Sequence, residues 1–196
     1  MVTTRPGGRT AAVRAAVLTA AADLLIESGL VALELTAVAE RAGVGKSTVY
    51  RRWGTVGSLV DDLLVDMAET SRRRPDTGSL EEDLMSVARL IQRTLADRRQ
   101  GSLFKAILAA GTCDARTAEA LAGFYRTRVE EMAPIVVDAV ARGEAPEGTD
   151  PAAVIRQVSA PLYYRLLTDT APLRRADADR AAAAAVAAVR AGVFTR

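Results

Sequence analysis

The stretch AGVGKSTVY, residues 42–50, contains the residue types of two different binding sites. A glycine followed by Lys-Ser ends the P-loop of nucleotide-binding proteins, in which backbone N–H groups surround phosphates and the lysine neutralises their charge. A glycine turn followed by a helix rich in hydroxyls and cations is instead typical of a helix-turn-helix that reads DNA. The residues around this stretch decide between the two interpretations.

The spacing argues against a P-loop. That motif needs a glycine five positions before its Gly-Lys pair, so that a loop leaves a strand and wraps the phosphates. Position 40 is instead Glu40, whose carboxylate would repel a phosphate. The preceding run LTAVAERAG has apolar residues at helical spacing and no alternating strand pattern. A nucleotide-dependent enzyme that uses the Gly-Lys-Ser run is therefore disfavoured, and it is kept as an alternative.

The same residues fit two short helices joined by a turn. Thr36 is a favourable N-cap for a helix that Gly43 ends, because glycine readily adopts the left-handed conformation at which many helices stop. In the next helix, Val49 and Trp53 lie four residues apart and are expected to face inward. We therefore predict a helix-turn-helix over residues 34–53.

The other sides of this second helix carry the groups that a helix in a DNA major groove needs. Lysine and hydroxyl groups bind phosphate oxygens, and arginine reads the edges of bases. A polar helix face that only contacts water has a similar composition, and this plainer interpretation remains open for each single residue. Lys46 and Tyr50 are expected at phosphates. The candidate DNA-binding residues are Thr36, Lys46, Ser47, Thr48, Tyr50, Arg51, Arg52 and Thr55.

The run LTAVAERAGVGKSTVYRRWGTVGSLVDDLL, from Leu35 to Leu64, resembles the DNA-binding domain of the tetracycline-repressor (TetR) family of bacterial transcription regulators. The matching features are the threonine at the first helix start, AERAGV into the turn, STVYRRW on the second helix, and Leu59 and Leu63 in the next helix. Three positions depart from the family pattern, one of them Ser47, where many members have glycine. Gly45 replaces a common capping serine, and Val56 replaces a lysine that contacts phosphate in many members.

The resemblance implies the domain organisation and the partners. It implies a helix-turn-helix domain over residues 9–55, a linking helix over 56–74, and a regulatory and dimerisation domain over 75–196. It also implies a homodimeric repressor that binds a palindromic double-stranded DNA operator, is released by a small-molecule effector, is not an enzyme and needs no cofactor. A helical adaptor that binds other proteins and never touches DNA is the second alternative.

Composition agrees with an all-α fold. The chain has 196 residues, of which 49% are hydrophobic, and it is rich in alanine, leucine and arginine with few aromatics. It has no histidine and one cysteine, Cys113, which excludes Cys/His zinc sites, Ser-His-Asp triads and internal disulfides. We expect Cys113 to be a small packing residue. The longest apolar run, residues 181–189, is too short to span a bilayer, so we expect a cytoplasmic protein without a membrane partner.

Charge is only mildly asymmetric. The net charge is +2, while residues 1–53 carry seven basic against four acidic groups, a surplus of three. A terminal DNA-binding module would produce such a bias, although the bias alone is weak support.

The remaining sequence predicts further helices. Ser79 and Asp150 are expected to cap two of them, Pro134 to kink a helix over residues 114–142, and Pro161 to bend or divide another. Bulky side chains in this half suggest a ligand pocket, although aromatics at helical spacing more often form core: Phe104, Leu108, Phe124, Tyr125, Met132, Tyr163 and Tyr164. The apolar faces of the last two helices suggest a subunit interface, with burial inside one chain as the alternative: Val154, Val158, Leu162, Ala184, Val186, Ala188 and Val189.

Overall fold

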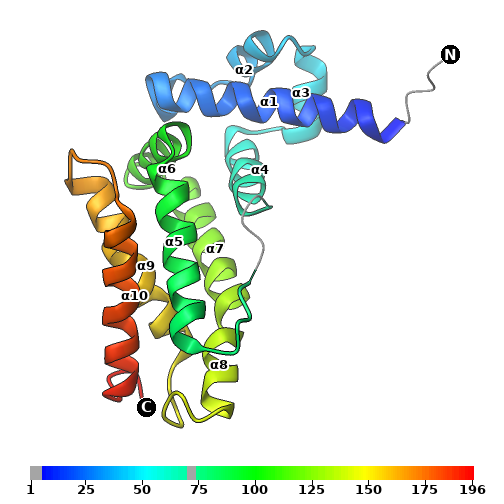
Figure 1. The fold of residues 1–196 in the computed structure, drawn as a ribbon. Coiled ribbons are helices and arrows are strands. Elements are labelled where there is room, and N and C mark those ends of the chain that lie inside the picture. The colour runs from blue at the N-terminus through cyan, green and yellow to red at the C-terminus, as the bar shows by residue number, and fades with distance from the viewer. Residues whose placement is uncertain (1–5, 70–73) are drawn as a thin grey trace, which may run out of the picture. The chain divides into compact units, whose positions relative to one another are not determined.

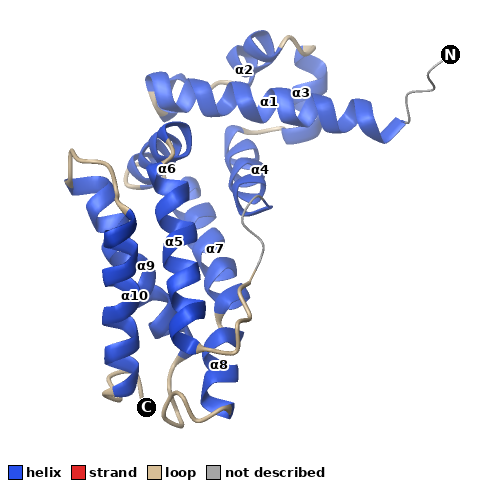
Figure 2. Ribbon diagram, in the orientation of Figure 1, coloured by secondary structure: helices blue, strands red, loops and turns tan. Residues whose placement is uncertain are grey.

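The computed structural model describes residues 6–69 and 74–196, and in this part of the chain regular structure is entirely helical (Figures 1 and 2). The all-α prediction is confirmed. The helices are α1 Pro6–Ser28, α2 Leu35–Ala42, α3 Lys46–Trp53, α4 Val56–Glu69, α5 Leu80–Ala96, α6 Arg98–Gly111, α7 Ala115–Met132, α8 Pro134–Ala141, α9 Pro151–Thr168 and α10 Arg175–Arg190, with a 3-10 turn, η1 Leu30–Ala32, after α1.

The helices form two compact units. One contains the described residues up to 69 together with Ala106–Phe124, and the other contains residues 74–105 and Tyr125–Arg196. Each unit has its own apolar core. The C-terminal half of α6 and the N-terminal half of α7 therefore group with the N-terminal helices.

The core of the N-terminal unit follows the predicted helical periodicity. Val17, Leu25, Val38, Val49 and Leu59 are buried there, from α1, α2, α3 and α4. Within each helix the buried residues lie three or four positions apart, as Leu35 and Val38 do in α2 and Leu59 and Leu63 in α4, which places them on one face. The four helices thus pack around a shared apolar centre.

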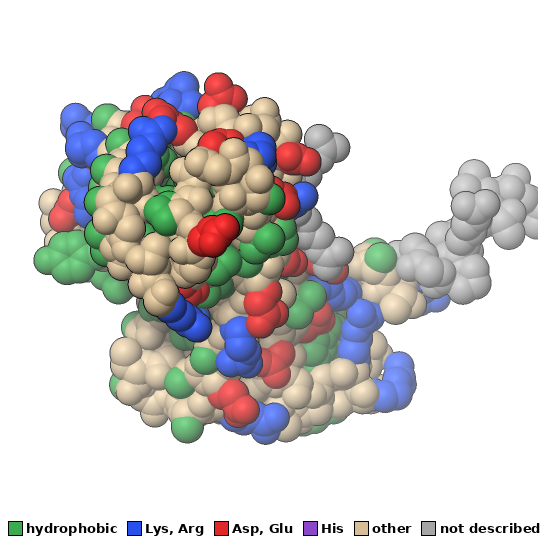
Figure 3. All heavy atoms as spheres, turned by 90° about the horizontal axis from the view of Figure 1, so that it is seen from below, with side chains coloured by type: hydrophobic (Ala, Val, Ile, Leu, Met, Phe, Trp, Pro, Cys, Tyr) green, Lys and Arg blue, Asp and Glu red, His purple; other side chains and the backbone are tan. Residues whose placement is uncertain are grey.

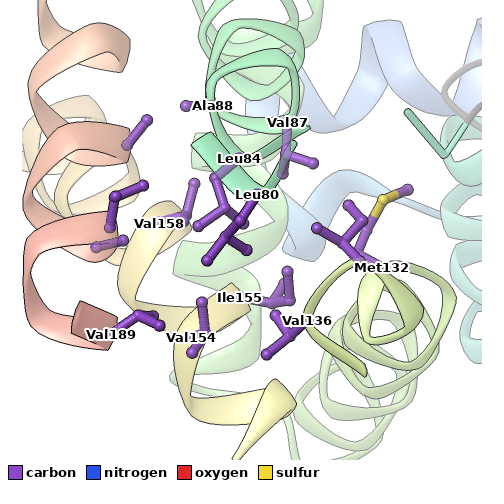
Figure 4. Close-up of a cluster of buried hydrophobic side chains, with 14 of the residues drawn as sticks. Leu80, Leu84, Val87, Ala88, Met132, Val136, Val154, Ile155, Val158 and Val189 are labelled. Atoms are coloured by element: carbon purple, nitrogen blue, oxygen red, sulfur yellow. The ribbon is translucent and has the colours of Figure 1, made fainter. Parts of the chain in front are cut away.

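The core of the second unit is built from α5, α8, α9 and α10 (Figure 4). Leu80, Leu84 and Val87 of α5 point toward Val154 and Val158 of α9, and Met132 at the end of α7 packs at the same cluster. Three alanines of α10, at positions 178, 182 and 185, are fully buried in it. Small side chains allow α10 to approach its neighbours closely, and van der Waals packing stabilises the contact.

This core corrects the predicted subunit interface. The apolar stripes of α9 and α10 face inward, within one chain, because α5 and α8 lie against them. Four of the seven predicted interface residues are buried in this core, and a fifth, Leu162, is also fully buried within the chain: Val154, Val158, Val186, Val189 and Leu162. Of the other two, Ala184 is exposed and Ala188 is half-buried. An interface between subunits would need the opposite faces of these helices.

Several predicted helix boundaries are confirmed and others are corrected. The Ser79 hydroxyl accepts from the Glu82 N–H at 3.4 Å, and Asp150 accepts from the Ala152 and Ala153 N–H groups. Pro134 separates α7 from α8 rather than kinking one helix. Pro161 lies inside a continuous α9, so it does not divide that helix.

The linking helix α4 is shorter than predicted. Its last described residue is Glu69, residues 70–73 lie outside the described part, and Arg74 is not helical.

Among the described residues, no helix is long and apolar enough to cross a membrane.

Candidate nucleic-acid interface

A tight turn positions α3 after α2. Gly43 has φ 65° and ψ 29°, the left-handed conformation predicted for it, and the Val44 N–H donates to the Ala39 carbonyl at 3.0 Å. Gly45 then starts α3 in an extended conformation without a side-chain cap. The AGVGKSTVY stretch is therefore the turn and second helix of a helix-turn-helix. No strand precedes it among the described residues, so the P-loop alternative lacks its scaffold.

One face of α3 is buried and the other is open. Val49 is 0% and Trp53 is 6% exposed, as predicted, and both anchor the helix on the N-terminal core. Tyr50 is 49% exposed, and Lys46, Ser47, Arg51 and Arg52 are also exposed, whereas Thr48 is half-buried. The exposed side of this two-turn helix thus carries two hydroxyl groups and three cationic groups.

The cations of α3 are not equivalent. Lys46 Nζ lies 2.8 Å from Glu40 Oε1, and the hydrogen bond between them lowers the pKa of Glu40 and raises the pKa of Lys46. Both side chains are largely exposed, so the pair contributes little to stability. Its effect is instead to place a carboxylate beside a cation that is a candidate for binding phosphate.

Arg52 is turned back toward α1. Its Nη1 donates to the Thr10 carbonyl at 3.3 Å, and its guanidinium lies 5.1 Å from the centre of the Trp53 ring. The guanidinium of Arg51 forms no ion pair with any described residue and extends from the exposed face. Arg51 is therefore better placed than Arg52 to contact a base edge.

Two predicted hydroxyl roles change in the structure. Thr36 is not the N-cap of α2, because the cap residue is Glu34, two positions earlier; the Thr36 hydroxyl instead donates to Glu34 Oε2 at 3.3 Å. Thr55 caps α4, since its Oγ1 accepts from the Ser58 N–H at 3.1 Å. The Ser58 N–H and the Thr55 hydroxyl are therefore already bonded within the chain.

A partly buried carboxylate behind α3 was not anticipated from the sequence. The indole Nε1 of Trp53 donates to Asp62 Oδ2 at 2.9 Å, and Arg14 Nη2 donates to Asp62 Oδ1 at 2.8 Å. Burial favours a raised pKa for Asp62, but the hydrogen bonds from Arg14 and Trp53 outweigh it and hold the pKa below its usual range. The hydrogen bond to Asp62 likewise raises the pKa of Arg14.

The surface carries mixed charge. Figure 3 shows basic and acidic side chains interspersed over the face in view, in keeping with a net charge of +2. No group of three or more possible metal ligands occurs among the described residues. With a net charge of only +2, attraction to DNA would come from the local cations of α3 rather than from a strongly basic chain.

The predicted aromatic pocket is largely filled by its own rings. Phe104 and Tyr125 both meet the Tyr163 ring edge-to-face, with centroids 5.9 and 5.4 Å away. Burial raises the pKa of Tyr163 to about 12, and burial also raises the pKa of Tyr125. Met132 belongs to the apolar core, and Tyr164 is 68% exposed, so neither lines such a pocket. Leu108 and Phe124 lie in the other compact unit and remain a prediction.

A different pocket lies at one end of the second unit. It has a volume of about 210 Å³ and lies between the α5–α6 junction and the loop that joins α9 to α10. Its lining is mixed: apolar side chains such as Leu95 and Leu166 stand beside the charged Arg98, Lys105, Arg165 and Asp169. Arg165 is held by Asp169, at 2.7 Å, and by Asp177.

Cys113, expected to be a packing residue, is exposed in the turn after α6.

Family models match both parts of the chain. Residues 17–63 match the model of bacterial regulatory proteins of the tetR family, and residues 74–185 match that of the tetracyclin repressor-like C-terminal domain. The first match includes α2 and α3 completely.

Curated relatives agree with the family models. An uncharacterized HTH-type transcriptional regulator of Bacillus subtilis, YdeS, is 33% identical over 153 residues, which is 78% of this chain and 77% of that protein. The HTH-type transcriptional regulator AqdR of Rhodococcus erythropolis is 38% identical over 76 residues, 39% of this chain and 37% of that protein.

Solved structures share the fold. Salmonella enterica GusR superposes with a TM-score of 0.77 at 19% identity, covering 96% of this chain and 98% of that chain. The TetR family transcription regulator SCO0332 superposes with a TM-score of 0.70 at 26% identity, covering 90% of this chain and 98% of that chain.

Proposed function

This chain belongs to the TetR family of bacterial transcription regulators, and from that premise we propose that it is a repressor that binds a palindromic DNA operator as a homodimer and is released by a small-molecule effector. It is a regulator with a DNA-binding helix-turn-helix and not an enzyme. Because a bacterial regulator must reach the chromosome, the proposal includes a cytoplasmic location for this protein.

The observation that carries the proposal is the exposed face of α3. Val49 and Trp53 anchor the helix from behind, so Lys46, Tyr50 and Arg51 project together from one side. Cations and hydroxyls position a helix on phosphates, and arginine distinguishes bases in the major groove. We assign phosphate contacts to Lys46 and Tyr50 and a base-edge contact to Arg51.

The other candidate residues have supporting roles in this proposal. Ser47 lies on the same exposed face and is assigned a base edge or a neighbouring phosphate. Thr48, Arg52, Thr36 and Thr55 are already engaged within the chain or half-buried, so each would have to change partners to contact DNA.

Two-fold symmetry accounts for a palindromic operator. Two copies of α3 read two half-sites when they are about 34 Å apart, one turn of DNA. For the subunit interface we propose the outward faces of α9 and α10. Ala160, Tyr164 and Leu167 are exposed at helical spacing on α9, and Ala183 and Ala187 are exposed on α10. Small and aromatic side chains on such faces suit packing between helices.

Release follows from linkage. The effector is expected to bind more tightly to a conformation in which the spacing of the two recognition helices does not match the DNA repeat. It then lowers operator affinity by the difference between its binding free energies to the two conformations, typically a few kcal/mol. The pocket that includes Lys105, Arg165 and Asp169 offers space and charged groups for a small ligand, whereas the aromatic cluster around Tyr163 is packed. We therefore propose this pocket as the place to look for effector binding.

The decisive experiment is selection of binding sites from random double-stranded DNA with purified protein in moderate salt. We expect an inverted repeat with one half-site spacing, bound with an affinity that falls steeply as salt rises. A helical adaptor would select no sequence and show little salt-dependent binding. A folded dimer that selects nothing, either alone or with cell extract as a source of co-repressor, would refute the proposal.

A further inference from the structure

The carboxylate of Asp62 joins three helices of the N-terminal unit. From α3, Trp53 Nε1 donates to Oδ2 at 2.9 Å; from α1, Arg14 Nε and Nη2 donate to Oδ1 at 3.0 and 2.8 Å. Arg14 Nη1 also reaches Asp66 Oδ1, one turn further along α4, at 2.8 Å. The side chains of Asp62 and Arg14 are only 25% and 22% exposed. Ionic hydrogen bonds in such partly buried places are stronger and more directional than those on the surface.

The helix α3 has few other features that determine its orientation. It contains eight residues, which is too short for independent stability, and its N-cap Gly45 supplies no side-chain bond. Its buried anchors are Val49 and Trp53. Burial of these two side chains decides which face of α3 points inward, but a non-directional apolar contact fixes the exact rotation of the helix less tightly than a hydrogen bond does. The indole hydrogen bond at the last residue of α3 supplies that direction.

We infer that Asp62 is a positioning residue for the recognition helix: by holding Trp53 to Arg14, it sets how the exposed face of α3 is presented to DNA. The inference rests on the proposed function. A carboxylate repels phosphate, so Asp62 would support binding only through α3. Arg52 reinforces the same arrangement, since it lies over the Trp53 ring and donates to the backbone of α1 at Thr10.

A neighbouring residue provides a matched control. Asp61 is exposed on the same helix and takes no part in the Trp53–Asp62–Arg14 contacts. Asp61→Asn and Asp62→Asn each remove one negative charge from the DNA-binding unit, which by electrostatics alone strengthens binding to DNA. The two variants therefore separate charge from position, because a positioning role predicts opposite directions.

The measurement is operator affinity well below the melting temperature, at fixed salt. We expect Asp61→Asn to bind as tightly as the wild type or slightly more tightly, and Asp62→Asn to bind roughly tenfold more weakly, comparable to loss of a direct contact. Trp53→Phe keeps an aromatic ring without the N–H donor and should weaken binding similarly. Combining it with Asp62→Asn should add little, because both changes break the same connection: asparagine has one accepting oxygen where aspartate has two, so it cannot accept from Trp53 and Arg14 at once.

The tryptophan provides a readout that needs no DNA. Trp53 is the only tryptophan in the chain, so its fluorescence reports on this indole alone. We expect the emission to change in Asp62→Asn and to be unchanged in Asp61→Asn.

The outcomes are separable. Loss of thermal stability in Asp62→Asn with full operator affinity in the folded protein would show a purely structural role and overturn the inference, as would affinity equal to that of Asp61→Asn. If Asp62→Asn does not fold, Trp53→Phe decides by the same affinity criterion. If the wild type binds no operator, the proposed function fails, whereas an emission change confined to Asp62→Asn would still establish the contact between Trp53 and Asp62.

Discussion

At the scale of single residues, Arg51 and Tyr50 test the proposed DNA-binding face. Both are exposed on α3, and neither is a core residue, so truncation should not unfold the unit. We expect Arg51→Ala and Tyr50→Ala each to cost about 1–3 kcal/mol of operator binding with an unchanged melting temperature. Arg41→Ala removes the same charge from α2 and is the control. If Arg51→Ala and Tyr50→Ala both bind the operator as tightly as the wild type and the Arg41→Ala control do, another face contacts DNA.

The ion pair between Lys46 and Glu40 suggests a gain of affinity. Glu40→Gln removes a carboxylate 2.8 Å from Lys46 and leaves that cation available to phosphate. We expect binding to tighten about two- to fivefold, the range of an exposed ion pair, and the plot of log affinity against log salt to steepen by about one, the increment for one further phosphate contact. Glu27→Gln, which makes the same charge change beside Arg41, should alter neither quantity. An unaltered slope in Glu40→Gln would argue that Lys46 is not at a phosphate.

At the scale of elements, α9 depends on the Asp150 cap. Its carboxylate accepts from the Ala152 and Ala153 N–H groups at 2.9 and 3.2 Å. The backbone hydrogen bond from Ala153, followed by the bond from Arg196, lowers the pKa of Asp150. We expect Asp150→Ala to lower the melting temperature by about 2–4 °C near neutral pH.

The pH dependence of this effect has a definite sign. Because the folded pKa of Asp150 is lowered, its contribution is complete above the ordinary aspartate pKa of about 3.9 and is lost as pH falls through the lower folded pKa. The melting-temperature difference between wild type and Asp150→Ala should therefore vanish in strong acid. Asp150→Asn, which retains an accepting oxygen, should keep most of the stability at neutral pH. A difference that persists unchanged at low pH would refute this account of the cap.

At the scale of the whole molecule, the outward face of α9 tests the homodimer. Tyr164 and Leu167 are 68% and 56% exposed. Replacing both with aspartate should leave the subunit folded, since they are outside its core, and should lower the solution mass from twice 20.7 kDa to 20.7 kDa at micromolar concentration. Val137→Asp places one aspartate on another exposed apolar position, on α8, and should remain dimeric; each single variant, Tyr164→Asp and Leu167→Asp, adds the same one charge to the proposed interface. A wild type with the mass of one chain would contradict the dimer itself.

What the sequence determined by itself is local and periodic. The left-handed Gly43, the buried Val49 and Trp53, and the caps at Ser79 and Asp150 all follow from short-range geometry or from helical spacing. Such signals lie within a few residues of one another, so one chain is enough to find them. They were sufficient to predict the helix-turn-helix and the residues on its open face.

Only the tertiary structure decided which partners those faces meet. Arg14 and Asp62 are 48 positions apart, and nothing in the spacing of either links it to the Trp53 indole. Periodicity likewise identified the apolar stripes of α9 and α10, but not that α5 and α8 would cover them within one chain. The physical reason is that the hydrophobic effect is non-directional: an apolar helix face is stabilised by burial against any apolar partner, so its pattern does not identify that partner. Ionic hydrogen bonds likewise form wherever packing brings their donors and acceptors together.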